Sequence, residues 1–256
     1  MELTRLEFLR KAWRTGIIIF GGASFEIMAG KALGAETAPP AGKRLAMAVD
    51  LRACLKAGQC EKCVDACHRG HNVPAIPDVK RAIAWIWRDD LERAMPGVLD
   101  DFSGGELRGA KPVLLCNQCG NPPCVRVCPT GATWKRGDGI VMMDQHRCIG
   151  CHYCMAACPY GSRSFNWSDP RKYLAKQSIN KDYPTRTKGT VEKCEFCAER
   201  VDRGQEPLCA SACGEKAIAF GDLRDGASAV RKALAGRIAL RRKPELGTDP
   251  AVYYLL

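Results

Sequence analysis

Sixteen cysteines are the residues of this 256-residue chain most able to do chemistry, and they form four groups of four with none left over. In chain order the groups are Cys54, Cys60, Cys63 and Cys67; Cys116, Cys119, Cys124 and Cys128; Cys148, Cys151, Cys154 and Cys158; and Cys194, Cys197, Cys209 and Cys213. A disulfide framework also uses an even number of cysteines, but it is typical of shorter chains and does not need such local clustering. Metal ligation does need such clustering.

The third group has the spacing Cys-x2-Cys-x2-Cys-x3-Cys-Pro, which is that of the bacterial ferredoxin run that holds [4Fe–4S] clusters. In two-cluster ferredoxins the fourth cysteine of such a run ligates the other cluster, so the groups must act in pairs. The second group has the same pattern with a two-residue insertion within Gly120–Pro123 and is the natural partner. The outer groups are looser, but all four groups keep the x3 gap before the last cysteine. We therefore expect four [4Fe–4S] clusters on the sixteen cysteines.

Other uses of these cysteines fit the pattern less well. Residues 148–152 match the haem c attachment string, but haem would leave Cys154 and Cys158 unexplained. Zinc ribbons pair one Cys-x2-Cys with another, whereas each inner group has four closely spaced cysteines. Every thiol already has a ligand role, and no nucleotide-binding loop or free acid–base pair is present, so we expect no catalytic site. Four histidines are expected to be structural or to donate hydrogen bonds that tune cluster potentials: His68, His71, His146 and His152.

The chain has a formal net charge of +11, which first suggests nucleic acid or another anionic surface as a partner. A ligated [4Fe–4S] cluster carries about −2 in its oxidised form, so four clusters contribute about −8 and leave a balance of about +3. No basic stretch is interleaved with aromatic side chains that could stack on bases. We interpret the basic excess as compensation for buried clusters and expect no nucleic-acid partner.

Residues 1–36 have the layout of an export signal. An uncharged stretch, residues 15–25, follows four basic residues, namely Arg5, Arg10, Lys11 and Arg14. This stretch is too short to span a bilayer, which takes roughly twenty residues. Residues 4–10 resemble the twin-arginine export motif, with Leu6 in place of the second arginine. We expect a leader that is exported with the folded protein, or retained as a membrane anchor, on the periplasmic face of the membrane. The alternative is an amphipathic N-terminal helix of a cytoplasmic protein.

The rest of the chain divides at its turn-forming residues. Residues 37–44 are expected to form a linker, residues 45–226 the four-cluster domain, and residues 227–256 a C-terminal helix and tail. The domain contains two insertions, at residues 68–115 and 159–193. The second insertion is basic and is expected to be a surface loop, either as a solvated face or as a docking site for a redox partner.

Apolar runs beside the cysteine groups predict most of the secondary structure. Short runs bounded by Gly, Pro or Asp predict strands at residues 45–51, 113–115, 140–143 and 217–220. The cysteine groups themselves are expected to form tight loops that lead into short helices. Residues 83–87 predict an amphipathic helix, and residues 227–242 predict a helix that stops before Pro244. The apolar tail, residues 251–256, is expected to pack onto the body of the protein or onto a neighbour.

The four motifs, together with Val191–Cys197, Phe220–Leu223 and Pro244–Thr248, resemble the ferredoxin-type iron–sulfur electron-transfer subunits of membrane-bound oxidoreductases. The small subunits of dimethyl-sulfoxide reductase and polysulfide reductase are examples. The resemblance covers roughly residues 45–254. Within that family, Cys67–Pro74 and Trp85–Trp87 resemble the extracytoplasmic iron–sulfur subunit of the Dsr transmembrane complex, which is associated with sulfite reductase.

This resemblance implies an α+β fold of two bacterial ferredoxin-like modules in tandem, with crossed pairing of the cysteine motifs, inserted loops and an N-terminal leader or anchor. It pairs motif one with motif four and motif two with motif three. The implied ligand sets are Cys54, Cys60, Cys63 with Cys213; Cys194, Cys197, Cys209 with Cys67; Cys116, Cys119, Cys124 with Cys158; and Cys148, Cys151, Cys154 with Cys128.

The resemblance also implies the partners. The chain would relay single electrons between a polytopic, quinone-interacting membrane subunit and a multihaem cytochrome c, in a hetero-oligomeric respiratory complex of sulfur metabolism. The alternative within the same chemistry is the small subunit of a molybdopterin oxidoreductase of the sulfur-compound or dimethyl-sulfoxide reductase type.

Overall fold

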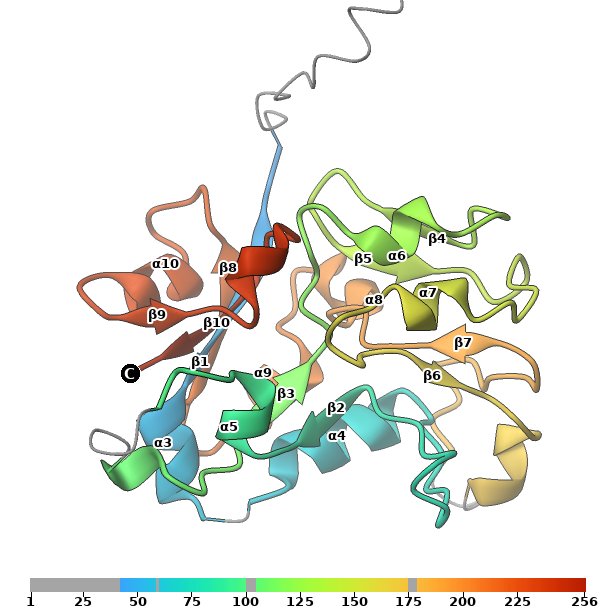
Figure 1. Cartoon of the computed structure of the whole chain (residues 1–256), viewed down its shortest axis with the longest axis horizontal. Coiled ribbons are helices and arrows are strands. Elements are labelled where there is room, and N and C mark those ends of the chain that lie inside the picture. Colours follow the sequence, from blue (N-terminus) through green and yellow to red (C-terminus); the bar gives the residue numbers. More distant parts are fainter. Residues whose placement is uncertain (1–41, 59, 100–104, 175–178) are drawn as a thin grey trace, which may run out of the picture. The chain divides into compact units, whose positions relative to one another are not determined.

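Strand β1 (Leu45–Asp50) lies inside the largest sheet of the protein (Figure 1). It pairs antiparallel with β8 (Ile218–Asp222) and parallel with β10 (Val252–Leu255), and β10 pairs antiparallel with β9 (Ala239–Leu240). The strand order is therefore β8-β1-β10-β9. The strands predicted at residues 45–51 and 217–220 are confirmed, and the apolar tail does pack onto the body as strand β10.

The computed structural model describes residues 42–58, 60–99, 105–174 and 179–256. The predicted leader, residues 1–36, and most of the predicted linker, residues 37–44, lie outside the described residues.

The side chains of β1 alternate between two buried faces. Leu45, Met47 and Val49 pack in the large core that also contains cysteines of the first, second and fourth motifs. Ala46 and Ala48 face the other way, against Val230 of helix α10 (Ala229–Leu234). A strand with both faces covered reads as an unbroken apolar run, which is how residues 45–49 appear in the sequence.

The other strands of the described residues form three two-stranded pairs. Strand β2 (Ile86–Arg88) pairs with β3 (Val113–Leu115), β4 (Thr133–Lys135) with β5 (Val141–Met143), and β6 (Ser164–Phe165) with β7 (Val191–Glu192), all antiparallel. The strands predicted at residues 113–115 and 140–143 are thereby confirmed. The 159–193 insertion is more than the predicted surface loop, because it starts and ends in the β6–β7 pair and buries Arg186.

The helix predicted over residues 83–87 is wrong. Ile86 begins strand β2 and lies opposite Leu115 of β3. Trp85 is buried, and its indole N–H donates a hydrogen bond to the carboxylate of Glu192 at 2.8 Å. Aromatic and β-branched residues fit a half-buried strand well, and a five-residue run is too short to nucleate a stable helix.

The helix predicted over residues 227–242 is much shorter than expected. Helix α10 spans Ala229–Leu234, and the side chain of Ser228 caps its N-terminus by accepting from the N–H of Arg231. Gly236 follows with a φ of 69°, the left-handed conformation in which glycine commonly ends helices. The chain then turns into β9.

The remaining helices are short and mostly adjoin the cysteine motifs: α3 (Leu51–Lys56), α4 (Lys62–Gly70), α5 (Leu91–Ala94), α6 (Pro123–Arg126), α7 (Tyr153–Ala156), α8 (Ala198–Val201), α9 (Leu208–Ser211), and the 3₁₀ turns η1 (Gly105–Leu107), η2 (Pro170–Tyr173) and η4 (Pro244–Leu246). Within the described part of the chain, no helix has both the length and the apolar character needed to cross a membrane.

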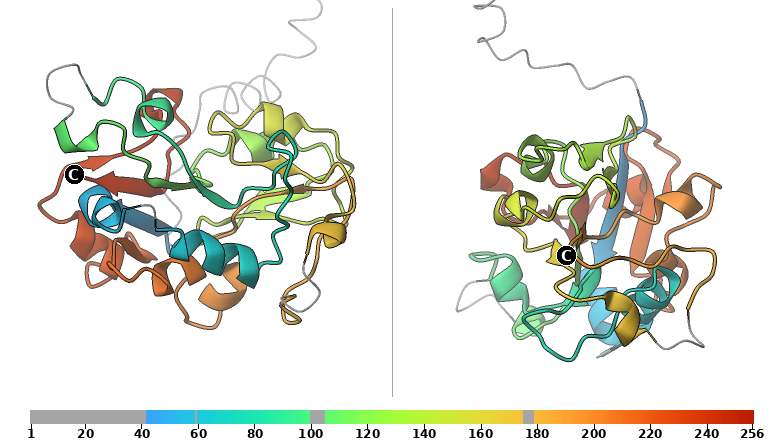
Figure 2. Two further views of the ribbon diagram at one scale, coloured as in Figure 1. Left: turned by 90° about the horizontal axis from the view of Figure 1, so that it is seen from below. Right: turned by 90° about the vertical axis from the view of Figure 1, so that its right-hand side faces the viewer.

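The four-stranded sheet and the pairs β4–β5 and β6–β7 lie at opposite ends of the unit formed by residues 42–256 (Figure 1). The view from below shows the same separation, with the sheet strands in blue and red at one end and the yellow-green hairpin region at the other (Figure 2). Helices of the outer motifs contact the four-stranded sheet, α3 at β1 and α9 at β8, whereas α6 of the second motif contacts β4.

Candidate cluster-binding sites

Each cysteine motif ends with a pair of cysteines four positions apart on or just after a short helix. Cys63 and Cys67 both lie in α4, whereas Cys124 lies in α6 and Cys128 two residues beyond its end. Four residues of helix advance about 6 Å along the axis. The last cysteine of a motif is therefore carried away from the three before it and toward a neighbouring group.

The structure brings the sixteen cysteines into four groups that each mix two motifs. We name them site A (Cys54, Cys60, Cys63, Cys213), site B (Cys67, Cys194, Cys197, Cys209), site C (Cys116, Cys119, Cys124, Cys158) and site D (Cys128, Cys148, Cys151, Cys154). At sites A, C and D the four cysteines line one hollow. At site B, Cys67 is buried and interacts electrostatically with three of the four cysteines of motif four, Cys194, Cys197 and Cys209.

Site A forms because the strand before motif one pairs with the strand after motif four. Strand β1 leads into motif one and β8 leaves motif four, and these strands pair. The N–H of Asp50 donates to the carbonyl of Ala217 at 2.8 Å, four residues before Cys54 and four after Cys213. The hollow at site A is rimmed by acidic side chains, those of Glu61, Asp65 and Glu215, together with Lys62.

Site B depends on close packing of α4 against α9. A Cβ atom at Gly70 would lie 2.1 Å from a methyl carbon of Leu208, so glycine lets the two helices approach. This contact places Cys67 of α4 next to Cys209 of α9. The N–H of Leu208 also donates to the sulfur of Cys197 at 3.4 Å.

The raised pKa values of the buried thiols indicate that the four groups need a bound cation. Burial raises the pKa of Cys63 to about 11, and repulsion from Cys54 and Cys213 adds to this effect. Burial likewise raises the pKa of Cys119 to about 12, with Cys116 as its first neighbour. Four buried thiolates therefore repel each other unless a cationic core holds them, which is the role of iron in a thiolate-ligated cluster.

Backbone donors support the same conclusion. Burial would raise the pKa of Cys128, but hydrogen bonds from the backbone of Thr133, Thr130 and Ala132 outweigh it and lower that pKa. The N–H of Ala217 donates to the sulfur of Cys213 at 3.3 Å. Such N–H···S bonds stabilise ligated thiolates, so the residues present fit [4Fe–4S] clusters.

Comparison with known proteins gives the family. The model of the 4Fe-4S dicluster domain matches residues 112–176 and 171–223, which include motifs two, three and four. The Hdr-like menaquinol oxidoreductase iron-sulfur subunit 1 of Archaeoglobus fulgidus is 42% identical over 233 residues, which are 83% of this chain and 83% of that protein. The chain is a ferredoxin-type iron–sulfur subunit of the membrane-oxidoreductase family. The resemblance inferred from the motifs is thus confirmed.

Two further relatives match this iron–sulfur subunit over most of their length. The menaquinone reductase iron-sulfur cluster-binding subunit of Nitratidesulfovibrio vulgaris is 35% identical over 232 residues, 82% of this chain and 87% of that one. The B subunit of polysulfide reductase from Wolinella succinogenes is 35% identical over 212 residues, 82% of this chain and 93% of that one. With this family and sixteen cysteines, the subunit carries four [4Fe–4S] clusters.

The four sites follow one another in the iron–sulfur subunit in the order A, B, C, D. Cys67 of site B interacts electrostatically with Cys63 of site A, because both lie in α4. Cys194 of site B interacts with Cys116 of site C. Cys154 of site D interacts with Cys124 of site C, and these two pack in one apolar cluster.

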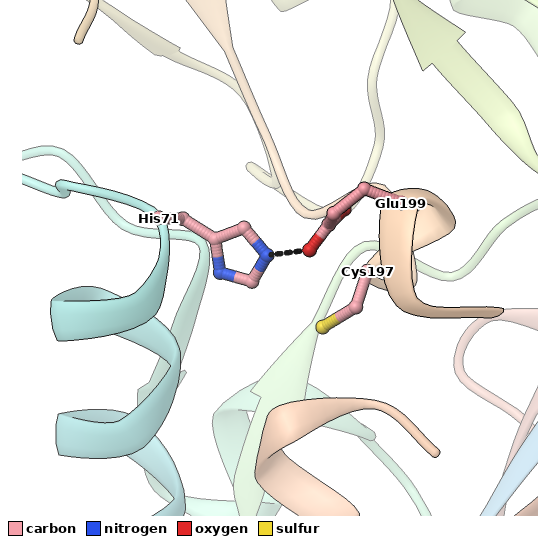
Figure 3. A group of neighbouring side chains, drawn as sticks. All are labelled: His71, Cys197 and Glu199. Atoms are coloured by element: carbon pink, nitrogen blue, oxygen red, sulfur yellow. Dashed lines mark hydrogen bonds and ion pairs between the residues drawn. The ribbon is translucent and has the colours of Figure 1, made fainter. Parts of the chain in front are cut away.

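His71 is a hydrogen-bond donor beside site B, as the sequence predicted for the histidines (Figure 3). Its Nδ1–H donates to the carbonyl oxygen of Cys67 at 2.9 Å, and Nε2 lies 3.1 Å from a carboxylate oxygen of Glu199. The ring stacks on Trp85. Figure 3 shows the sulfur of Cys197 beside this pair. The group has metal-ligand chemistry, but Cys197 belongs to site B, so His71 and Glu199 lie around that site and form no separate one.

Sequence reasoning missed two buried cations beside the clusters. Lys193 is almost fully buried and donates to the carbonyls of Val141 and Cys194. Arg163 is 5% exposed and lines the hollow of site C. Lys193 stands directly before Cys194, and that position next to a ligand was a usable signal. Arg163 stands five residues after Cys158 and had no such signal.

Proposed function

We propose that this subunit relays single electrons along its four clusters in the order A, B, C, D. The observation that carries the proposal is the exposure of the two ends of the series. Site A opens as a hollow, and Cys151 of site D is exposed, whereas all four cysteines of site B are buried. Electrons then enter and leave at sites A and D and pass through the buried sites between them.

The crossed ligand sets are part of this proposal. The last cysteine of each motif ligates the cluster of the paired motif, so that Cys213 completes site A, Cys67 site B, Cys158 site C and Cys128 site D. The grouping of the cysteines in the structure supports this wiring. Each pair of motifs then corresponds to one bacterial ferredoxin-like module.

The partners we propose are a polytopic, quinone-interacting membrane subunit and a multihaem cytochrome c, in a respiratory complex of sulfur metabolism like the Dsr complex. A quinone partner is supported by two relatives, one named for menaquinol oxidation and the other for menaquinone reduction. Quinol chemistry delivers electrons that a chain of one-electron clusters can pass on singly. In this proposal the chain itself needs no substrate site. Turnover of sulfur compounds by the isolated chain with artificial donors would refute the lack of a catalytic site.

The alternative is the small subunit of a molybdopterin oxidoreductase. The similarity to the B subunit of polysulfide reductase over 93% of that protein is the observation that favours it. Purification of the native complex, with haem, iron and molybdenum assays, separates the two. Haem c and a polytopic membrane protein that copurify with the chain support the first proposal, and a large molybdenum-containing subunit supports the alternative.

The location we propose is the periplasmic face of the membrane, reached by export of the folded protein. The basic and uncharged segments of residues 1–36 support it. Intact mass of the native chain tests the fate of the leader. A mature chain that begins near Glu36 indicates cleavage and rules out a retained anchor, whereas a full-length chain in the membrane fraction supports the anchor.

A further inference from the structure

Arg163 carries a positive charge in the interior of the protein. Its side chain is among the buried ones, with 5% of the residue exposed. In the described part of the chain it forms no ion pair with a carboxylate, unlike Arg186, which approaches Glu192. A guanidinium stays protonated in proteins, and a buried unpaired charge is strongly destabilising. Something else must balance the charge of Arg163.

The position of Arg163 indicates what balances it. The residue lines the hollow of site C. One guanidinium nitrogen lies 3.8 Å from the sulfur of Met143, and Met143 lines the hollow of site D. The other terminal nitrogen donates to the hydroxyl of Thr133 at 2.8 Å. Arg163 therefore lies between the two sites and is held there by the β4–β5 pair.

The electrostatics agree with this placement. Burial would lower the pKa of Arg163, but the thiolates of Cys124, Cys154 and Cys116 outweigh it. Cys124 and Cys116 belong to site C and Cys154 to site D. A positive charge this near both sites favours the reduced form of each cluster, which has one more negative charge.

We propose that Arg163 is a positioning residue whose single charge raises the reduction potentials of the clusters at sites C and D together. The inference rests on the proposed ligand sets but not on the proposed partners. It accounts for why no carboxylate of the described residues pairs with Arg163, because a nearby acid would cancel the effect. One charge shared by two adjacent clusters shifts both potentials in the same direction.

The test is a redox titration of the purified full-length chain with its clusters, followed by electron paramagnetic resonance. For Arg163→Gln we expect the ratio of reduced to oxidised cluster at a fixed applied potential to fall at least tenfold for two clusters, which is about 59 mV for one electron. The other two clusters should be unchanged. Arg163→Lys keeps the charge and should change no ratio more than about threefold, or roughly 30 mV by the same conversion. Arg136→Gln is the matched control, because that arginine is already paired with Asp138 and Asp202.

Three results would overturn the inference: unchanged potentials in Arg163→Gln, an equal shift of all four clusters, or an equal shift in the lysine and glutamine variants. If Arg163→Gln does not assemble its clusters, Arg163→Met decides instead. That variant removes the charge but keeps an unbranched side chain, and it must lower the potentials of the same two clusters. Unchanged potentials in Arg163→Met would then refute the role of Arg163. Copurified partners have no part in these readouts, so failure here is distinct from failure of the proposed relay.

Discussion

Replacement of Cys213 by alanine should damage the cluster of the first motif and spare that of its own motif. Cys213 lines the hollow of site A with Cys54, Cys60 and Cys63, and repulsion from Cys213 contributes to the raised pKa of Cys63. Cys209, only four residues earlier, interacts more strongly with Cys197 of site B than with Cys63 of site A. Two cysteines of one motif are therefore expected to serve different clusters.

Double variants test these ligand sets by the amount of iron that each variant retains. Four [4Fe–4S] clusters hold about 16 iron atoms per chain, and loss of one leaves about 12. Under crossed ligation, Cys60→Ala with Cys213→Ala removes two ligands of the same cluster and leaves about 12, whereas Cys209→Ala with Cys213→Ala damages two clusters and leaves about 8. Uncrossed ligation predicts the reverse, about 8 for the first pair and about 12 for the second.

The assay is iron and acid-labile sulfide per chain after anaerobic purification, read with spin-counted electron paramagnetic resonance. The resonance is needed because a site with three cysteines left can hold a three-iron cluster and lose less iron than the full count. In that case the number of altered clusters, one or two, distinguishes crossed from uncrossed ligation. Two altered clusters in Cys60→Ala with Cys213→Ala would refute the crossed assignment.

Three further predictions concern assembly and stability. Gly150 has a φ of 68°, and a Cβ atom there would lie 2.6 Å from the carbonyl oxygen of Gly189, so Gly150→Ala should lose the cluster at site D. Gly161 is the control, because it has a φ of 64° but nothing lies within 4 Å of an added Cβ atom. Gly161→Ala should lower the free energy of unfolding by only about 1–2 kcal/mol and keep all four clusters. Asp50 caps α3 by accepting a hydrogen bond from the N–H of Ala53, and its carboxylate pairs with Arg237 at 2.5 Å. Asp50→Ala should therefore lower the free energy of unfolding by about 1 kcal/mol, and Asp50→Asn, which keeps a capping group, by less. Anaerobic chemical unfolding measures both. Removal of iron by a chelator should abolish cooperative unfolding and near-ultraviolet circular dichroism, because cysteines of sites A, B and C lie in the main core; a chelated chain with native dichroism would contradict this.

The cofactor could be predicted from the sequence because cluster ligands are close together in the chain. The spacing of the inner motifs identified the cluster type, and the apolar runs at residues 45–51 and 113–115 identified the strands beside them. The pairing of motif one with motif four could not come from spacing. It depends on β1 pairing with β8, a contact between strands more than 160 residues apart, and only the family resemblance implied it.

The errors arose where tertiary packing decides the structure. Residues 83–87 contain two tryptophans two positions apart, which is the period of a strand and not of a helix. The pairing of Ile86 with Leu115 and the buried bond from Trp85 to Glu192 fix the end of this run as a strand. The role of Arg163 was equally hidden, because its neighbours Thr133 and Met143 are distant in sequence. Local propensity has no access to such contacts.

Passage of electrons through the four clusters in series can be measured as haem reduction in membranes that contain the native complex. A menaquinol analogue is added, and the absorbance of haem c is followed with the wild-type chain and with Cys194→Ala, which removes a buried ligand of site B. We expect haem reduction with the wild type and its loss in the variant, while the subunits still copurify and the cluster at site D keeps its signal. Haem reduction at the full rate without the cluster at site B would contradict the relay.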